Sequence, residues 1–248
     1  MCKELTLLKH VNLQSILRSA VMDGRLDLID YIVWIGGDVT RRDPNNAALL
    51  EWPVQDNRIA MVERLLYYGA DKTQRDSKGI PLMHEAVIRN KLDMVKLLVN
   101  PADAEWRGKD GAQFTLCATK RNNVEMLDVL FAYGADKAWR DAQGQSLLYY
   151  AVLHGAEDAV KYFLDAGEDI DGITADRMSY LEVAVDHFHL NVLSFLLEKV
   201  PSTSIRAAGM CSHMQFWAAN PMSYPICLET ALLRTMKRLS LPCILRYN

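Results

Sequence analysis

A spacing of about 33 residues runs through most of this chain. Within one short apolar stretch of each copy a small residue recurs, at intervals of 33, 33, 32, 33 and 33 residues. The residues that mark the period are Ala20, Pro53, Ala86, Ala118, Ala151 and Ala184. A fixed period of this size predicts a repeat architecture. The fold must therefore follow from one small unit and from how its copies stack.

Each copy predicts two helices joined by a tight turn. In the third copy, apolar residues recur with helical spacing in two neighbouring stretches, first Leu82, Met83, Ala86 and Val87, then Leu92, Met94, Val95, Leu97 and Leu98. Gly69, Gly134 and Gly167 follow second helices, where a left-handed C-cap is needed. Pro101 replaces this Gly in the third copy, so its second helix is expected to end early. Neither helix can bury its apolar face alone, so the copies must stack.

The third copy carries the most complete motif. It reads Asp76, Gly79, Pro81, His84 and Ala86, followed by the pair Leu97-Leu98. These residues resemble the ankyrin repeat motif, D-x-x-G-x-T-P-L-H-x-A followed by a second helix and L-L-x-x-G-A-D. The resemblance covers about residues 13 to 206. It implies an all-α repeat solenoid of about six stacked ankyrin repeats, each a helix-turn-helix with a β-hairpin finger.

The motif also divides the chain into three predicted parts. Residues 1–14 lack it and are expected to form an N-terminal cap. Residues 15–206 form the repeat array, and residues 207–248 are expected to form a degenerate seventh repeat or C-terminal capping helices.

Composition favours a packed protein inside the cell. Half of the 248 residues are hydrophobic and the net charge is -3, which demands neither nucleic acid nor an anionic membrane as partner. The five cysteines are dispersed, which is typical of reduced thiols in the cytoplasm or nucleus. No apolar run is long enough to span a bilayer. We therefore expect a cytoplasmic protein, with the nucleus as the other compartment.

No residue pattern predicts chemistry. The chain contains no glycine-rich phosphate loop and no nucleophile or metalloprotease motif. His84 matches the structural histidine of the family, while His187 and His189 are two apart and would face away from each other on a helix. We expect neither an enzyme, nor a cofactor, nor a metal site.

The turns and helix ends predict a binding surface instead. Four residues beyond the turn aspartates Asp38, Asp71, Asp103 and Asp136 stand four arginines, and in the family this position projects toward the concave side. Two tryptophans precede two of these arginines, and the ends of first helices add further basic residues. Arg and Trp are enriched in interface hot spots. The predicted partner-binding residues are Arg42, Arg75, Arg89, Trp106, Arg107, Lys120, Arg121, Trp139, Arg140 and His154.

These residues predict a monomeric protein-binding scaffold whose partner carries an acidic segment, acting as an inhibitor or host-interaction protein. The slightly acidic overall charge argues against nucleic acid as the ligand. One alternative is a ubiquitin-ligase adaptor, because Leu241, Pro242, Leu245 and Tyr247 resemble parts of F-box and SOCS-box tails. Another is an enzyme assembled by the last 48 residues, which contain Cys211, His213, Cys227 and Cys243.

Overall fold

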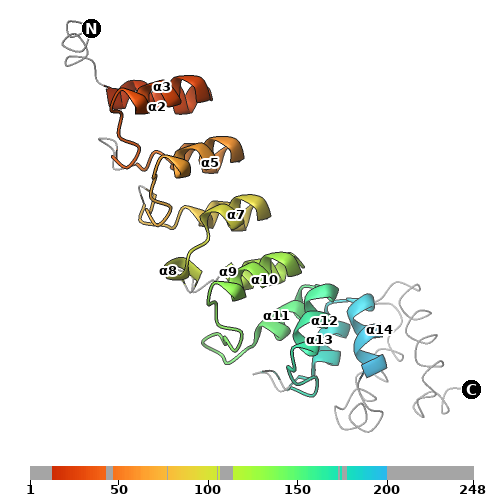
Figure 1. The fold of residues 1–248 in the computed structure, drawn as a ribbon. Coiled ribbons are helices and arrows are strands. Elements are labelled where there is room, and N and C mark those ends of the chain that lie inside the picture. The colour runs from red at the N-terminus through yellow and green to blue at the C-terminus, as the bar shows by residue number, and fades with distance from the viewer. Residues whose placement is uncertain are drawn as a thin grey trace, which may run out of the picture. The chain divides into compact units, whose positions relative to one another are not determined.

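The computed structural model describes residues 13–42, 47–76, 78–104, 106, 114–172, 174 and 178–199 (Figure 1). These residues form thirteen helices, α2 to α14, and contain no sheet. The all-α repeat fold predicted from the sequence is confirmed. The predicted N-terminal cap lies almost entirely, and the segment 207–248 entirely, outside the described residues.

Six helix pairs repeat along the chain, and a short extra helix lies after the third pair. The first helices of the pairs are α2 (Leu13–Asp23), α4 (Glu51–Gln55), α6 (Met83–Ile88), α9 (Phe114–Lys120), α11 (Leu147–Leu153) and α13 (Tyr180–Asp186). The second helices are α3 (Leu26–Trp34), α5 (Ile59–Tyr67), α7 (Leu92–Leu98), α10 (Val124–Ala132), α12 (Glu157–Asp165) and α14 (Leu190–Lys199). The extra helix is α8 (Pro101–Ala104).

The small residues that mark the period are all buried in first helices, which explains why each must be small. The turn between the helices of each pair repeats with the same spacing. One residue in every such turn has a left-handed φ between 55° and 77°. These residues are Gly24, Asn57, Asn90, Asn122, Gly155 and Phe188. Glycine and asparagine suit this conformation, whereas phenylalanine is strained in it.

The predicted C-caps are present, and so is the predicted exception. Gly69 follows α5 with a φ of +90°, and its neighbour Ala70 donates a hydrogen bond back to the carbonyl of Leu65. In the third pair α7 ends at Leu98, and the extended Val99 follows it. Asn100 then caps α8 by accepting a hydrogen bond from the N–H of Asp103 at 3.1 Å.

The chain divides into two compact units. Unit 1 comprises residues 1–118 and 125–136, and unit 2 comprises residues 119–124 and 137–248. Within unit 1, α2, α4 and α6 pack in a row, each against its own second helix, and α5 packs on α7. Within unit 2, α11 packs on α13 and α12 on α14. Each unit is thus a stack of helix pairs.

The expected finger hairpins are reduced to single antiparallel bridges among the described residues. Arg75 bridges to Pro81 in unit 1, and Arg140 bridges to Ser146 in unit 2. None of the described helices has the length and apolar character needed to cross a bilayer.

Candidate functional site

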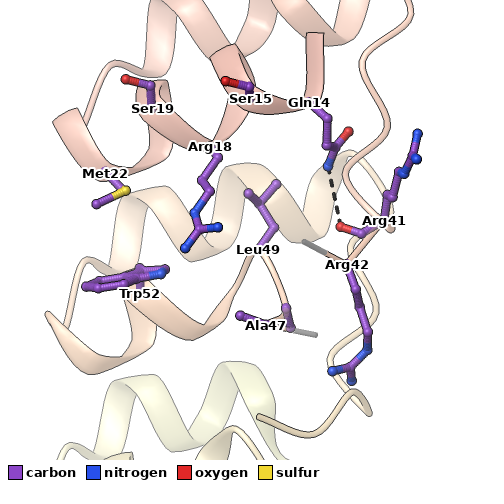
Figure 2. Close-up of a pocket in the computed structure, with 11 residues that line it drawn as sticks. Gln14, Ser15, Arg18, Ser19, Met22, Arg41, Arg42, Ala47, Leu49 and Trp52 are labelled. Carbon is purple, nitrogen blue, oxygen red and sulfur yellow. Dashed lines mark hydrogen bonds between the residues drawn. The ribbon is translucent and has the colours of Figure 1, made fainter. Parts of the chain in front are cut away.

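A pocket of about 610 Å³ opens between α2 and α4 in unit 1 (Figure 2). The residues of α2 that line it share one helix face, because they recur every three or four positions. The lining residues are Gln14, Ser15, Arg18, Ser19 and Met22 of α2, Arg41 and Arg42 of the following finger, and Ala47, Ala48, Leu49 and Trp52. These described residues include three arginines and no carboxylate. The pocket therefore favours a negatively charged ligand.

The interior of the pocket joins one guanidinium to apolar side chains. Figure 2 shows that Arg18 extends from α2 and ends between Trp52 and Leu49. Met22 lies beside Trp52 at the same end of the pocket. Met22 is 45% exposed and Trp52 is 40% exposed, so both are accessible to a ligand. A ligand here meets positive charge and apolar surface together.

The other end of the pocket is formed by the finger that follows the first repeat. Gln14 donates a hydrogen bond from Nε2 to the carbonyl oxygen of Arg41 at 3.4 Å, which ties α2 to this finger. Arg42 donates from Nη2 to the carbonyl oxygen of Arg75 in the next repeat at 2.7 Å. The finger is thus anchored on both sides.

The predicted arginine column requires a correction in unit 1. Arg42 bonds the backbone of the next finger, and Nη2 of Arg75 lies 2.9 Å from Oδ1 of Asp103. Both side chains are half-buried. Because consecutive fingers lie against each other, the guanidinium of one reaches acceptors on the next. These arginines clamp neighbouring repeats together.

Asp103 was expected to be a turn aspartate like Asp38 and Asp71, but the structure places it differently. Asp38 and Asp71 lie in exposed turns, where each accepts hydrogen bonds from the N–H and hydroxyl of the threonine two residues on. Asp103 is instead 2% exposed within α8, and its Oδ2 accepts a hydrogen bond from Nδ2 of Asn100 at 2.8 Å. Proline at position 101 favours the first turn of a helix, so α8 replaces the turn.

Trp106 lies in an aromatic cluster. Its ring stacks on Phe114, with the centroids 5.3 Å apart, and meets the edge of His84 at 5.2 Å. The side chain is half-buried. Arg107, the next predicted residue, lies outside the described residues, so its place in the arginine column stays a prediction.

Trp139 in unit 2 is buried, with 5% of its surface exposed. The prediction that its ring contacts a partner is therefore wrong. The ring lies 6.2 Å from that of Tyr150, whose hydroxyl donates a hydrogen bond to Oδ2 of Asp141 at 2.7 Å. Burial, together with this bond, raises the pKa of Tyr150 to about 12. Trp139 thus packs within the array, near Tyr150 of α11.

Arg140 follows the same pattern as the clamping arginines. Its Nη2 lies 3.6 Å from Oε2 of Glu168, which belongs to the next repeat of unit 2. About half of the Arg140 side chain remains exposed. This arginine can still meet a ligand, although it already has a partner within the array.

The predicted basic residues at the ends of first helices are exposed. In unit 1, Arg89 lies at the end of α6, where its Nε pairs with Oε1 of Glu85 at 2.5 Å. Its Nη1 also donates to the carbonyl oxygen of Gln55 in the preceding repeat at 3.1 Å. Arg89 therefore adds little net charge to its surroundings.

Unit 2 presents a basic group at the ends of α9 and α11. Lys120, Arg121 and His154 are all exposed. Nζ of Lys120 lies 5.2 Å from the centroid of the Tyr150 ring, within the range of a cation–π contact. The His154 imidazole is nevertheless partly covered by its neighbours, and this loss of hydration, followed by the charges of Lys120, His189 and His187, lowers its pKa. Of the predicted residues, these three form the group that is best placed to meet a ligand in unit 2.

The two histidines that were expected to face apart lie close together. The rings of His187 and His189 stack with centroids 6.2 Å apart. The expectation assumed a helix, but α13 ends at Asp186 and the turn residue Phe188 has a φ of +60°. That left-handed residue brings the two side chains onto the same side. Even so, no cluster of three possible metal ligands occurs among the described residues.

Of the lining residues only Arg42 was predicted from the sequence, and the two central side chains, Arg18 and Trp52, were missed. Arg18 stands two residues before Ala20, the position that His84 occupies in the third repeat. Trp52 stands one position later in its own repeat, directly before the period-marking residue Pro53. The sequence signal for the pocket was Arg18 at a motif position and Trp52 at the neighbouring position one repeat later. The pocket itself depends on the stacking of two repeats, so no single motif reveals it.

Comparison with known proteins agrees with the helical repeat geometry. A family model described as "Ankyrin repeats (3 copies)" matches residues 82–174 and 114–207. Among solved structures, a crystal structure of an ankyrin repeat domain from Acinetobacter baumannii AYE has a TM-score of 0.59. It is 21% identical, and the match covers 73% of this chain and 95% of that chain. No curated protein matches the sequence.

Proposed function

Since this chain belongs to the ankyrin repeat family, we propose that it is a non-enzymatic scaffold that binds another protein through its first helices and fingers. Ankyrin repeats generally mediate protein–protein interaction, because their stacked units present an extended surface. The proposal adds to this general role a charge preference for the partner and the surfaces that contact it.

The observation that carries the proposal is the pocket between α2 and α4. Three arginines line it, and no carboxylate occurs among its described lining residues. The accessible Trp52 beside Arg18 supports protein binding, because Trp and Arg are enriched among residues that dominate interface energies. The partner therefore carries an acidic segment, which the positive pocket attracts.

The basic group of unit 2 supports the same charge preference. Lys120, Arg121 and His154 are exposed at the ends of α9 and α11. An acidic segment of the partner is attracted by this group as well. The net charge of -3 for the whole chain favours a protein over nucleic acid as this partner.

The proposed mode of action is binding alone, without a chemical reaction. Binding would occupy the partner's surface, as an inhibitor or host-interaction protein does, with the chain acting as a monomer in the cytoplasm or nucleus. The alternative, recruitment to a ubiquitin ligase, rests on residues 207–248. These lie outside the described residues, so no structural observation favours it.

A capture experiment with matched charge changes tests the proposal. The intact chain, an R18E/W52A variant, a K120E/R121E variant and an R25E control are immobilised and exposed to lysate. Arg25 is an exposed arginine in the turn between α2 and α3 and does not line the pocket. Proteins held by the intact chain and the control but lost with either surface variant support the proposal. If no protein is held, or if all four chains hold the same proteins, the proposal is wrong.

A further inference from the structure

We propose that the pocket between α2 and α4 recognises a partner segment in which a Glu or Asp carboxylate lies next to a large apolar side chain. This inference rests on the proposed function and deepens it. It assigns the charge to Arg18 and the apolar contact to Met22 and Trp52.

The choice of a carboxylate as the charged group of the ligand follows from the number of guanidinium groups inside the pocket. Arg18 points inward, whereas Arg42 is held by the carbonyl of Arg75 and Arg41 points away from the interior (Figure 2). One guanidinium has five N–H donors in a planar fork, which matches a planar carboxylate carrying a single charge. A phosphate carries nearly two charges and is typically bound by a cluster of arginines. The geometry therefore favours a carboxylate.

The apolar group of the ligand is inferred from two accessible side chains at one end of the pocket. Met22 is 45% exposed and Trp52 is 40% exposed, and neither is needed to fill the core between the helices. The core of this region is formed by Leu17, Ala20 and Val54, which are buried. A flexible methionine beside an indole ring adapts to apolar side chains of different shapes.

Arg18 lies next to the apolar side chains, and this defines how far apart the carboxylate and the apolar group of the ligand can be. The Arg18 side chain ends between Trp52 and Leu49, directly beside the apolar end (Figure 2). A ligand side chain on Trp52 and a carboxylate on Arg18 must therefore come from residues that are close in sequence. The inference predicts an Asp or Glu within one or two positions of a Leu, Met, Phe or Trp.

The test uses peptides selected from a random display library on the intact chain. The enriched peptides are synthesised with a fluorophore in three forms: as selected, with each Glu or Asp replaced by its amide, and with phosphoserine at that position. Affinities are measured by fluorescence anisotropy for the intact chain, R18Q, W52A, K120E/R121E and the control R25Q, with circular dichroism as the check on folding.

The expected result is a selected motif that pairs a carboxylate with an apolar residue. Loss of the guanidinium in R18Q or of the carboxylate in the amide peptide weakens binding about tenfold, and the two losses together cost no more than either alone. W52A weakens all forms, and R25Q changes none.

Three outcomes overturn the inference. They are a library that yields no such motif, tighter binding of the phosphoserine form, and binding that is insensitive to R18Q. If K120E/R121E abolishes binding of acidic peptides while R18Q does not, the proposed acidic partner stands and only this pocket assignment fails. If the selected peptides carry no acidic residue, the charge preference in the proposed function fails as well.

Discussion

Nη2 of Arg75 lies 2.9 Å from Oδ1 of Asp103, a carboxylate whose side chain is only 2% exposed. Residues of neighbouring repeats form this pair, and Asn100 bonds the other carboxylate oxygen. A column of arginines that looks like a binding surface in the sequence thus stabilises the stack. This relationship changes what mutation of the column should do.

Replacing Arg75 with Gln should destabilise unit 1. The substitution leaves the buried Asp103 carboxylate without its cation, which costs several kcal/mol for a fully buried pair. Because Arg75 is 38% exposed, screening by solvent reduces the expected loss to about 1–2 kcal/mol. Urea unfolding followed by circular dichroism measures it.

R25Q provides the matched control for this pair. Arg25 pairs with Asp27, but both side chains are more than half exposed, so the substitution should leave the urea midpoint almost unchanged. Equal unfolding midpoints for R75Q and R25Q would show that the clamp contributes nothing.

Replacing Phe188 with Asn should stabilise unit 2. Phe188 has a φ of +60° in a turn where the other five repeats place glycine or asparagine. A bulky residue in this region is strained, and relief of the strain is worth about 1 kcal/mol. Thermal unfolding should show a higher midpoint for F188N. The reverse change N57F, at the same turn position in unit 1, should lower it, and a fall in both variants would contradict this account.

Unit 2 should lose stability as the pH falls below about 6.5. Partial loss of hydration and the nearby charges of Lys120, His189 and His187 lower the pKa of His154 in the folded protein. The unfolded chain then binds more protons than the folded chain at acidic pH, so stability rises with pH in this range. Unfolding midpoints at pH 7.5 and 5.5 measure the effect.

The variant H154Q isolates the contribution of this histidine. It removes one titrating group while keeping a polar side chain, so the difference between the two midpoints should become smaller. An unchanged difference would mean that other groups cause the pH dependence.

Replacing Ser179 with Ala should weaken the start of α13. The Ser179 hydroxyl accepts a hydrogen bond from the N–H of Glu182, and Oε2 of Glu182 accepts one from the N–H of Ser179 at 2.7 Å. Loss of such a capping box costs about 1 kcal/mol. Urea unfolding should show this loss for S179A, whereas S179T should retain most of the stability. Equal losses in both would argue against the hydroxyl's role.

The elements could be predicted because their signals are local. Gly69 ends a helix because glycine adopts the left-handed conformation easily. Pro101 disfavours helix for the residue before it, and α7 ends at Leu98. Each of these effects acts within a few residues, so it leaves a mark in the sequence at a readable spacing.

The surface could be predicted only in part. Lys120 and Arg121 are exposed as expected because they stand at a helix end. Trp139 is buried instead, with its ring near that of Tyr150 in α11, and Arg42 is held by the carbonyl of Arg75 in the next repeat. The partner of Arg42 lies 33 residues away and the neighbour of Trp139 lies in the following helix, so no local pattern encodes these contacts.

The sequence by itself determined the repeat, its period and the ends of most helices, because backbone propensities and apolar spacing act within one unit. Only the tertiary structure decided which charged and aromatic side chains serve the stack and which meet a ligand. Arg75 and Arg18 are the same residue type on neighbouring repeats, yet one pairs with a buried carboxylate and the other lines a pocket. The physical reason is that stacking, and not residue type, sets the acceptors within reach of each guanidinium.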